Sequence, residues 1–301
     1  ITPIEGTPAF KEGILAGDKI LKANGESLEG LSLIEATKRL KGPVDTQVTL
    51  EVLHPGERTP VEITLTRAKI KIESVKGTRI VDAEDHIGYL RITQFQEDTA
   101  GQFRKAVKKL KSQGMKKLIV DLRFNPGGLM SGAVDVADEF LDDGVIVSTI
   151  GRNKEKETMR AQKGGLLLEE PVAILVNKGS ASASEILAAA LQDYRRAITL
   201  GTRTFGKGSV QTPYRVDGGR SMLKLTTAYY YTPNGHCIHK GVPCRHGAKY
   251  CYHKQNDEEL KLGGLRPSVE VEMSAGQELA LRQFIHDRDM ENYKHNDEAI
   301  K

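Results

Sequence analysis

The stretch Val172–Asp193 reads VAILVNKGSASASEILAAALQD, an apolar strand that turns directly into a helix. Its first five residues are a continuous apolar run, as expected of a strand that is buried on both faces. Three serines alternate with small residues where the strand gives way to the helix, at Ser180, Ser182 and Ser184. A helix that follows a buried strand presents unpaired backbone N–H groups at the strand's carboxyl end. The small residues exclude bulk there, so the backbone of a substrate could approach this junction.

The same alternation of strands and helices continues on both sides of this junction, from residue 68 to residue 275. Strands are predicted at residues 87–92, 117–122, 197–201 and 221–231, and helices at residues 99–113 and 132–141. This pattern predicts an α/β (α+β) fold with an open sheet covered by helices. Residues 276–301 are expected to form a C-terminal helical extension, with its helix at residues 276–289.

The composition of the chain is ordinary for a soluble globular protein and excludes two classes of function. Lys and Arg number 44 against 40 Asp and Glu, which leaves a net charge of only +4. The lysines of residues 105–117 form the solvated side of an amphipathic helix, since Phe103, Val107 and Leu110 supply its apolar face. No apolar run approaches the ~20 residues that a membrane span needs. We therefore expect no nucleic-acid partner and no transmembrane segment in this chain.

Residues 1–67 form a separate unit with its own pattern of short strands and turns. Residues 19–23 alternate as a strand and stop at Asn24-Gly25, which is a strong signal for a tight turn. The stretch PIEGTPAFKEGILAGDKILKANG (residues 3–25) resembles a PDZ domain, which implies capture of a peptide's carboxyl terminus as an added strand. The strands and the carboxylate loop that would precede Ile1 are missing, so we expect an N-terminally truncated PDZ domain. A small unit that only packs on its neighbour is the alternative.

Ser182 has two interpretations on the residues alone. Ser182 and Glu185 have the spacing of a capping box, in which each side chain satisfies the other residue's backbone N–H group. A catalytic serine would instead need a base, and Lys207 lies between two glycines in TFGKGSVQ (residues 204–211). A lysine can act as a base only when burial favours its neutral form, and otherwise Lys207 is an ordinary surface residue. These local patterns leave both alternatives open.

A family resemblance favours the catalytic interpretation. GSASASEILAAALQDYRRA (residues 179–197) followed by GTRTFGKGSVQ (residues 201–211) is similar to the carboxyl-terminal processing peptidases, also called tail-specific proteases. The resemblance implies a serine endopeptidase in which Ser182 is the nucleophile and Lys207 is the general base. It also implies that Gln211 orients the amine of the lysine, as a third group orients the base in other triads.

A second motif, DLRFNPGG (residues 121–128), ends another buried strand in a glycine-rich turn. Such a turn can point backbone N–H groups at an anion. The family resemblance implies that Gly127 or Gly128 supplies one oxyanion donor and that Ala183 N–H supplies the other. By the same resemblance, the reaction needs no cofactor and no catalytic metal.

The resemblance also sets expectations for substrates and location. Substrates are expected to be proteins or peptides with apolar C-termini, delivered through the PDZ unit. The expected location is extracytoplasmic, periplasmic or secreted, with membrane association through a segment absent here. A homo-oligomer stays open as an expectation. The alternative function is a non-catalytic or gated tail-binding module on the same fold.

An insertion at residues 236–262, within the protease core of residues 68–275, departs from the family pattern. It repeats Cys-x-His three times, as Cys237-Ile238-His239, Cys244-Arg245-His246 and Cys251-Tyr252-His253. Thiolates and imidazoles suit a tetrahedral structural Zn²⁺ site, although this spacing matches no standard zinc finger. The candidate zinc ligands are Cys237, His239, Cys244, His246, Cys251 and His253. A disulfide with one remaining thiol and unliganded surface residues are the alternatives.

Overall fold

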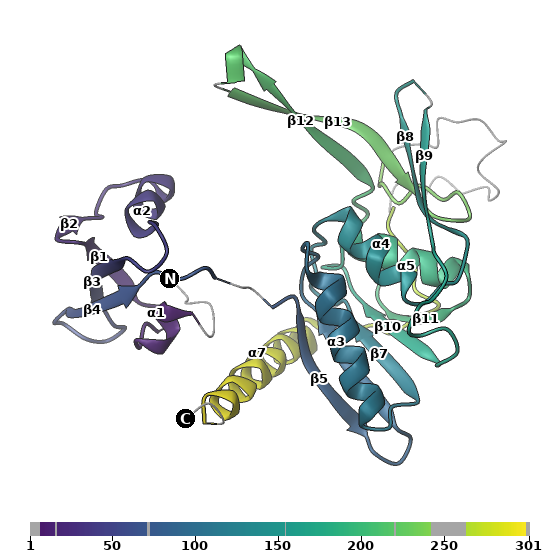
Figure 1. Cartoon of the computed structure of the whole chain (residues 1–301), viewed down its shortest axis with the longest axis horizontal. Helices are drawn as coiled ribbons and strands as arrows, with labels where there is room; N and C mark the ends of the chain where they lie inside the picture. Colours follow the sequence, from purple (N-terminus) through teal and green to yellow (C-terminus); the bar gives the residue numbers. More distant parts are fainter. Residues whose placement is uncertain are drawn as a thin grey trace. The chain divides into compact units, whose positions relative to one another are not determined.

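The computed structural model describes residues 7–15, 17–70, 73–153, 155–219, 221–241 and 263–298 (Figure 1). The chain divides into two compact units, one of residues 1–72 with residues 283–301, and one of residues 73–282. Among the described residues the fold is α/β, with three sheets and their helices, which confirms the predicted class. None of the helices in these ranges combines the length and the apolar character that a membrane crossing requires.

The first unit contains an antiparallel sheet in the order β2-β1-β3-β4. Its strands are β1 (Lys19–Ala23), β2 (Glu26–Ser27), β3 (Gln47–Leu53) and β4 (Val61–Thr66), and its helices are α1 (Pro8–Lys11) and α2 (Leu33–Leu40). The predicted tight turn between β1 and β2 is present, with positive φ at Asn24 and Gly25 (50° and 80°). Ile14, Leu50 and Val52 belong to a small core that this unit does not share with the second.

The second unit is built on a sheet in the order β14-β11-β10-β7-β6-β5. Its strands are β5 (Val75–Asp82), β6 (Ile87–Ile92), β7 (Lys117–Asp121), β10 (Val172–Val176), β11 (Ala197–Gly201) and β14 (Val269–Glu270). All neighbours pair in parallel except β5 with β6. Because parallel strands end at the same edge of a sheet, the segments that follow β7 and β10 meet there, where α/β folds usually bind ligands.

Three helices cover one face of this sheet, namely α3 (Thr99–Ser112), α4 (Met130–Asp138) and α5 (Ala183–Asp193) (Figure 1). α5 follows β10 as predicted, and its residues 183–191 are all buried. The helix predicted at residues 132–141 starts and ends earlier than expected. It ends at Asp138 because Glu139 and Phe140 donate to carbonyls three residues back, at 3.2 Å and 3.0 Å, which closes the helix with a tighter turn.

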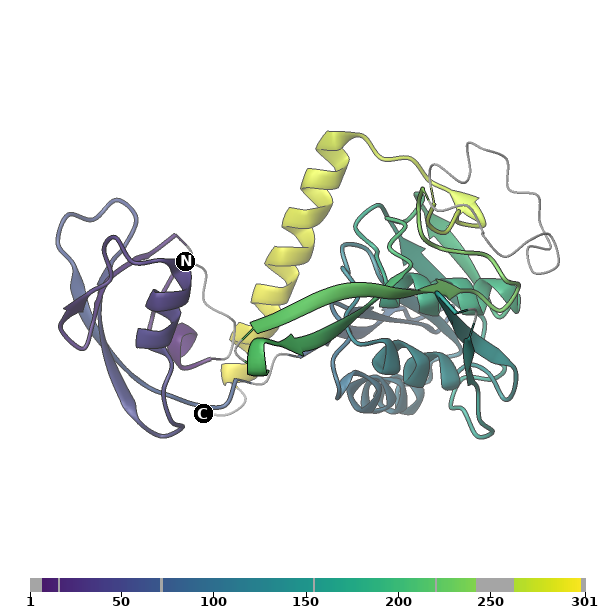
Figure 2. The same cartoon turned by 90° about the horizontal axis from the view of Figure 1, so that it is seen from above.

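A second sheet in this unit has the order β12-β13-β8-β9. Its strands are β8 (Val145–Gly151), β9 (Lys156–Arg160), β12 (Ser209–Val216) and β13 (Ser221–Tyr231). β12 and β13 form a hairpin that runs out from the body of the unit as a long arm, which Figures 1 and 2 show from two sides. β12 begins two residues after Lys207, so the arm and the candidate base belong to one continuous segment.

The last described helix, α7 (Ala275–Glu298), is longer than the predicted residues 276–289. Residues 277–298 contain no glycine and no proline. Since these two residue types are the strongest helix breakers, nothing in this stretch stops the helix at the predicted position.

Candidate active site

Ser182 lies at the junction between β10 and α5, at the carboxyl edge of the parallel sheet. Its backbone has φ 56° and ψ −114°, a combination that non-glycine residues rarely adopt. Such strain costs about 1–3 kcal/mol and persists only where the surrounding structure enforces it, most often at functional sites. The strain therefore makes Ser182 a candidate for function as well as for capping.

The two neighbouring serines hold this junction against the DLRFNPGG segment. Ser180 Oγ donates to Leu122 O at 2.8 Å, and Ser184 Oγ donates to Asn125 O at 3.0 Å. Both of these serines are completely buried, whereas 8% of Ser182 remains exposed. Of the three serines, Ser182 is thus the one that is both strained and accessible.

Gly127 packs directly against the Ser182 turn. A Cβ on Gly127 would lie 2.5 Å from Ala181 O and 2.9 Å from both Ala183 N and Ser182 Cβ. Its φ of 96° is a further reason for glycine at this position. The glycine-rich turn and the turn of the candidate nucleophile are therefore in contact, backbone to backbone.

The three expected oxyanion donors differ in availability. Gly127 N–H donates to Asn125 Oδ1 at 2.9 Å, and Asn125 Nδ2 in turn donates to Ile92 O at 2.8 Å. Within the described residues, the N–H groups of Gly128 and Ala183 have no hydrogen-bond partner. Of the three expected donors, Gly128 and Ala183 are therefore the two whose N–H groups are available.

A buried ion pair holds the start of the same turn. Asp121 is completely buried and accepts from Arg123 Nη2 at 2.6 Å and from the Tyr89 hydroxyl at 2.9 Å. Burial and the charge of Asp121 raise the pKa of Tyr89, so this hydroxyl stays protonated and continues to donate. Burial opposes the charge of Arg123, but its hydrogen bond to Asp121 raises the pKa overall. The strand end that leads into the glycine-rich turn is thereby fixed by charge as well as by packing.

Glu185 connects the candidate nucleophile to the Lys207 turn (Thr204–Gly208). Its side chain is completely buried, and its carboxylate accepts Ser182 N–H at 2.8 Å, which is the Glu185 side of the predicted capping box. The same carboxylate accepts the hydroxyl of Thr204, Gly206 N–H at 2.7 Å and Lys207 N–H at 2.9 Å. Burial raises the pKa of Glu185, while these hydrogen bonds act in the opposite direction. One carboxylate therefore fixes the backbones of both candidate catalytic residues.

The side chain of Lys207, in contrast, is exposed, and its amine has no hydrogen bond or ion pair with any residue in the described ranges. Gln211 is exposed as well, and it pairs with Thr226 across the hairpin, next to a bulge between Val210 and Gln211. Bulges re-aim side chains and are common beside active sites. The structure thus joins the backbones of Ser182 and Lys207 through Glu185, but among the described residues the lysine amine makes no hydrogen bond to Ser182 or to Gln211.

The start of the Cys/His-rich insertion and the segment that follows the insertion both contact the Lys207 turn. At the start of the insertion, Gly208 N–H donates to His239 Nδ1 at 3.2 Å. Three residues after the insertion, Leu265 N–H donates to the hydroxyl of Thr204 at 2.7 Å. Burial and the nearby charge of Lys240 lower the pKa of His239, in agreement with a neutral ring that accepts a hydrogen bond.

Only two of the candidate zinc ligands, Cys237 and His239, lie in the described part of the chain, because Cys244, His246, Cys251 and His253 fall outside it. Cys237 is buried, and the Nδ1 atom of His239 is engaged by Gly208. No group of three or more metal-binding side chains occurs among the described residues. The zinc site and its alternatives therefore stay predictions.

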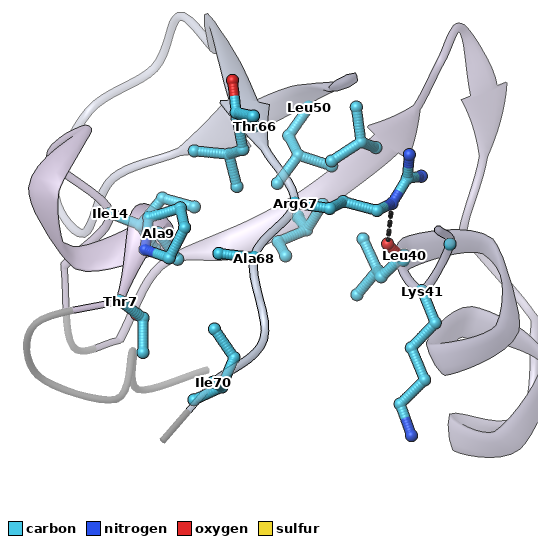
Figure 3. Close-up of a pocket in the computed structure, with 15 residues that line it drawn as sticks. Thr7, Ala9, Ile14, Leu40, Lys41, Leu50, Thr66, Arg67, Ala68 and Ile70 are labelled. Carbon is cyan, nitrogen blue, oxygen red and sulfur yellow. Dashed lines mark hydrogen bonds between the residues drawn. The ribbon is translucent and has the colours of Figure 1, made fainter. Parts of the chain in front are cut away.

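The first unit has a pocket of its own, with a volume of about 410 Å³, which Figure 3 shows. Its walls are mainly apolar and include Ile14, Leu50 and Leu65. Arg67 Nε donates to Leu40 O at 2.9 Å across one side of the pocket. The pocket therefore suits apolar groups and has a cationic edge.

From the sequence alone, Glu185 is predicted only as a capping residue and His239 only as a zinc ligand. In the structure, each of these side chains also accepts a backbone N–H group of the Lys207 turn. The capping spacing was the one signal that marked Glu185. Its bonds to residues 204–207 join parts of the chain about twenty residues apart, and such long-range contacts leave no local pattern.

Comparison with known proteins identifies the family of the chain. Residues 86–244 match peptidase family S41, and residues 2–53 match a PDZ domain. The carboxy-terminal-processing protease of Bartonella bacilliformis is 46% identical over 244 residues, which are 79% of this chain and 55% of that protein. The carboxyl-terminal-processing protease of Synechocystis sp. is 40% identical over 242 residues, which are 80% of this chain and 56% of that protein.

A solved structure, the photosystem II D1 C-terminal processing protease, is also similar to this chain. The TM-score is 0.55 and the sequence identity is 32%, with 89% of this chain and 66% of that chain covered. The chain spans about half the length of the curated relatives it matches. These matches show that the chain belongs to peptidase family S41 and carries a PDZ domain ahead of its peptidase region.

Proposed function

We propose that this chain is the catalytic part of a serine endopeptidase that cleaves proteins recognised through apolar C-terminal tails. Ser182 is the nucleophile, Lys207 is the general base and Gln211 orients the lysine. The observation that carries the proposal is the Glu185 carboxylate, which accepts the N–H groups of Ser182 and Lys207 in one buried hydrogen-bond system. A helix cap alone would need only the first of these two bonds.

In the proposed reaction, the neutral amine of Lys207 removes the proton of Ser182 Oγ as this oxygen attacks the carbonyl carbon of the scissile peptide. The tetrahedral oxyanion is bound by the N–H groups of Gly128 and Ala183, and the loss of one such donor usually costs about 3 kcal/mol. The protonated lysine then gives its proton to the leaving amine. The same lysine removes a proton from the water that hydrolyses the acyl-enzyme.

The exposed position of Lys207 sets a condition on this reaction. A lysine acts as a base only in its neutral form, and removal from water favours that form. A bound substrate that covers Lys207 would supply this desolvation and bring the amine toward Ser182. The proposed site is therefore at rest until a substrate occupies it.

The substrate class rests on the PDZ domain and on the names of the relatives. The relatives are named for processing at a carboxyl terminus, and PDZ domains bind a peptide's carboxyl terminus as an added strand. The apolar walls of the pocket in Figure 3 suit the side chains of an apolar tail. An extracytoplasmic location belongs to the same proposal.

The exposed lysine also favours one second candidate function, a gated or non-catalytic module that binds protein tails. In such a module, Ser182 would serve as a cap and Lys207 as a surface residue. The two candidates differ in one measurable property, which is peptide-bond cleavage that depends on both residues.

The test is cleavage of an unfolded protein that ends in Leu-Ala-Ala. The proposal predicts cleavage by the wild type and by a control, Lys108→Ala, which changes an exposed lysine on α3. It predicts no cleavage by Ser182→Ala or Lys207→Ala. Undiminished cleavage in either variant would contradict the assigned dyad. If the wild type is silent, a longer natural chain is tested next, where activity would indicate gating and silence would favour the tail-binding module.

A further inference from the structure

The Lys207 turn is held by two separate side chains. Glu185 accepts the N–H groups of Gly206 and Lys207, at 2.7 Å and 2.9 Å. The next N–H group, that of Gly208, donates to His239 Nδ1 at 3.2 Å. Three successive amides of this turn therefore end on side chains instead of backbone carbonyls. Glu185 belongs to the helix of the proposed nucleophile, whereas His239 belongs to the first residues of the Cys/His-rich insertion.

His239 is itself fixed by contacts of its ring and its backbone. The ring packs on Tyr229, with ring centroids 5.1 Å apart and ring planes inclined by 44°. A Cβ on Gly208 would lie 2.5 Å from His239 N, so the two backbones are in close contact. The following residue, Lys240, donates its N–H to Gly206 O at 3.1 Å. A well-supported segment therefore presents the imidazole to the Gly208 amide.

We propose that His239 is a positioning residue for the general base and acts on Lys207 through the Gly208 amide. The inference rests on the proposed function, because it assigns a support to the proposed base. Glu185 fixes the peptide plane before the Lys207 Cα, and His239 fixes the plane after it. The backbone that carries the Lys207 side chain is thereby held in place, while the amine at the end of this side chain is free to turn toward Ser182.

The expected effect of losing this support is a loss of rate. A general base must come within about 2.6–3.2 Å of the proton that it removes. A displacement of about 1 Å in a catalytic group can cost on the order of 10²-fold in rate. Without the His239 bond, the peptide plane between Lys207 and Gly208 can rotate, and the starting point of the lysine side chain moves with it.

Two substitutions separate the hydrogen bond from the packing of the ring. Nδ1 accepts a hydrogen bond only when it carries no proton, so the ring proton is on Nε2. The carboxamide oxygen of asparagine can take the place of Nδ1 as an acceptor, whereas leucine fills much of the ring's space without an acceptor. His239→Asn therefore keeps the proposed support, and His239→Leu removes it.

The first arm of the test measures kcat and KM on the unfolded substrate. We expect His239→Leu to lower kcat by about 10- to 100-fold with KM within about twofold, because the position of the base matters mainly in the transition state. His239→Asn should recover most of this loss. The matched control is His86→Asn, the same exchange between β5 and β6, where a φ of 53° suits asparagine. Equal kcat in the leucine and asparagine variants would overturn the inference.

The second arm does not depend on activity. Amide hydrogen exchange in residues 204–211 should be faster in His239→Leu than in the wild type, and slow again in His239→Asn. Unchanged amide exchange in His239→Leu would overturn the inference. If leucine prevents folding, His239→Ala replaces this variant. Cleavage that survives Ser182→Ala or Lys207→Ala would refute the proposed function, and exchange would still decide whether His239 holds the turn.

Discussion

The fold restrains the two halves of the candidate site, the surroundings of Ser182 and those of Lys207, to different degrees. Around Ser182, the backbone is strained, the flanking serines are buried and Gly127 leaves no room for a Cβ. Around Lys207, the backbone is hydrogen-bonded but the side chain is exposed. Under the proposed function, the fold already holds the nucleophile Ser182 in place before substrate binds. The base Lys207 reaches its working position only when its side chain moves, while the turn that carries it stays fixed. Control of activity then lies with the lysine half.

The largest effect is expected from a substitution that breaks the rigid half. Gly127→Ala places a Cβ 2.5 Å from Ala181 O and must push the glycine-rich turn away from Ser182. Since the proposed nucleophile and the proposed oxyanion donors then separate, kcat on the unfolded substrate should fall on the order of 10³-fold. Gly164→Ala is the control, because its φ is 106° and a Cβ there has nothing within 4 Å. An equal loss of kcat in both variants would show that the backbone strain of a non-glycine residue at positive φ explains the effect. The close approach of residue 127 to the Ser182 turn would then play no part.

The next effect is expected from the residue that joins the two halves. Glu185→Gln keeps one carbonyl oxygen but turns an NH₂ group toward N–H donors, so the bonds to Ser182 and to the Lys207 turn cannot all survive. We expect kcat to fall by about 10²-fold, as for other misplaced catalytic groups. Glu35→Gln is the matched control, since Glu35 has the same capping position in α2 of the first unit. A wild-type kcat in the Glu185 variant would mean that the two halves do not need this link.

A smaller effect is expected where a buried bond supports only the backbone. Ser184→Ala removes the hydrogen bond to Asn125 O and leaves this carbonyl without that donor. Because Asn125 O still accepts Ala181 N–H, the free energy of unfolding, measured in urea, should fall by about 0.5–1.5 kcal/mol, while kcat should change by less than about tenfold. A loss of kcat as large as that of Gly127→Ala would place Ser184 among the reacting groups instead.

The smallest effect concerns the pH dependence of stability. Burial raises the pKa of Glu185 above its ordinary value of 4.5, so the folded state binds this proton more tightly than the unfolded state. The resulting stability is complete below the unfolded pKa and is lost as pH rises through the folded pKa. The unfolding free energy of the wild type should therefore decrease relative to Glu185→Gln as pH rises above 4.5. A difference between the two proteins that does not vary with pH would contradict the raised pKa.

Much of the main sheet could be predicted because its signals are local. The apolar run Val172–Val176 and the small residues that follow it predict β10 and α5 with the observed bounds. The second sheet was only partly predicted. Its strand β8 pairs with β13, about eighty residues further along the chain, and a local pattern cannot show such a pairing.

The candidate site shows the same limit. Motifs identify Ser182 and Lys207, but they do not show that Glu185 binds both backbones or that His239 accepts the amide of Gly208. The exposure of the lysine is likewise a property of the folded chain. The hydrogen bonds that hold the candidate site and the exposure of Lys207 therefore become visible only in the structure.

The most direct test of the central claim is covalent labelling with a fluorophosphonate, followed by peptide mapping. A serine activated by a base reacts with such a probe, whereas a capping serine does not. We expect the label on Ser182 in the wild type and much slower labelling in Lys207→Ala. A label on another residue, or equal labelling of Ser182 without the lysine, would contradict the claim that these two residues act together.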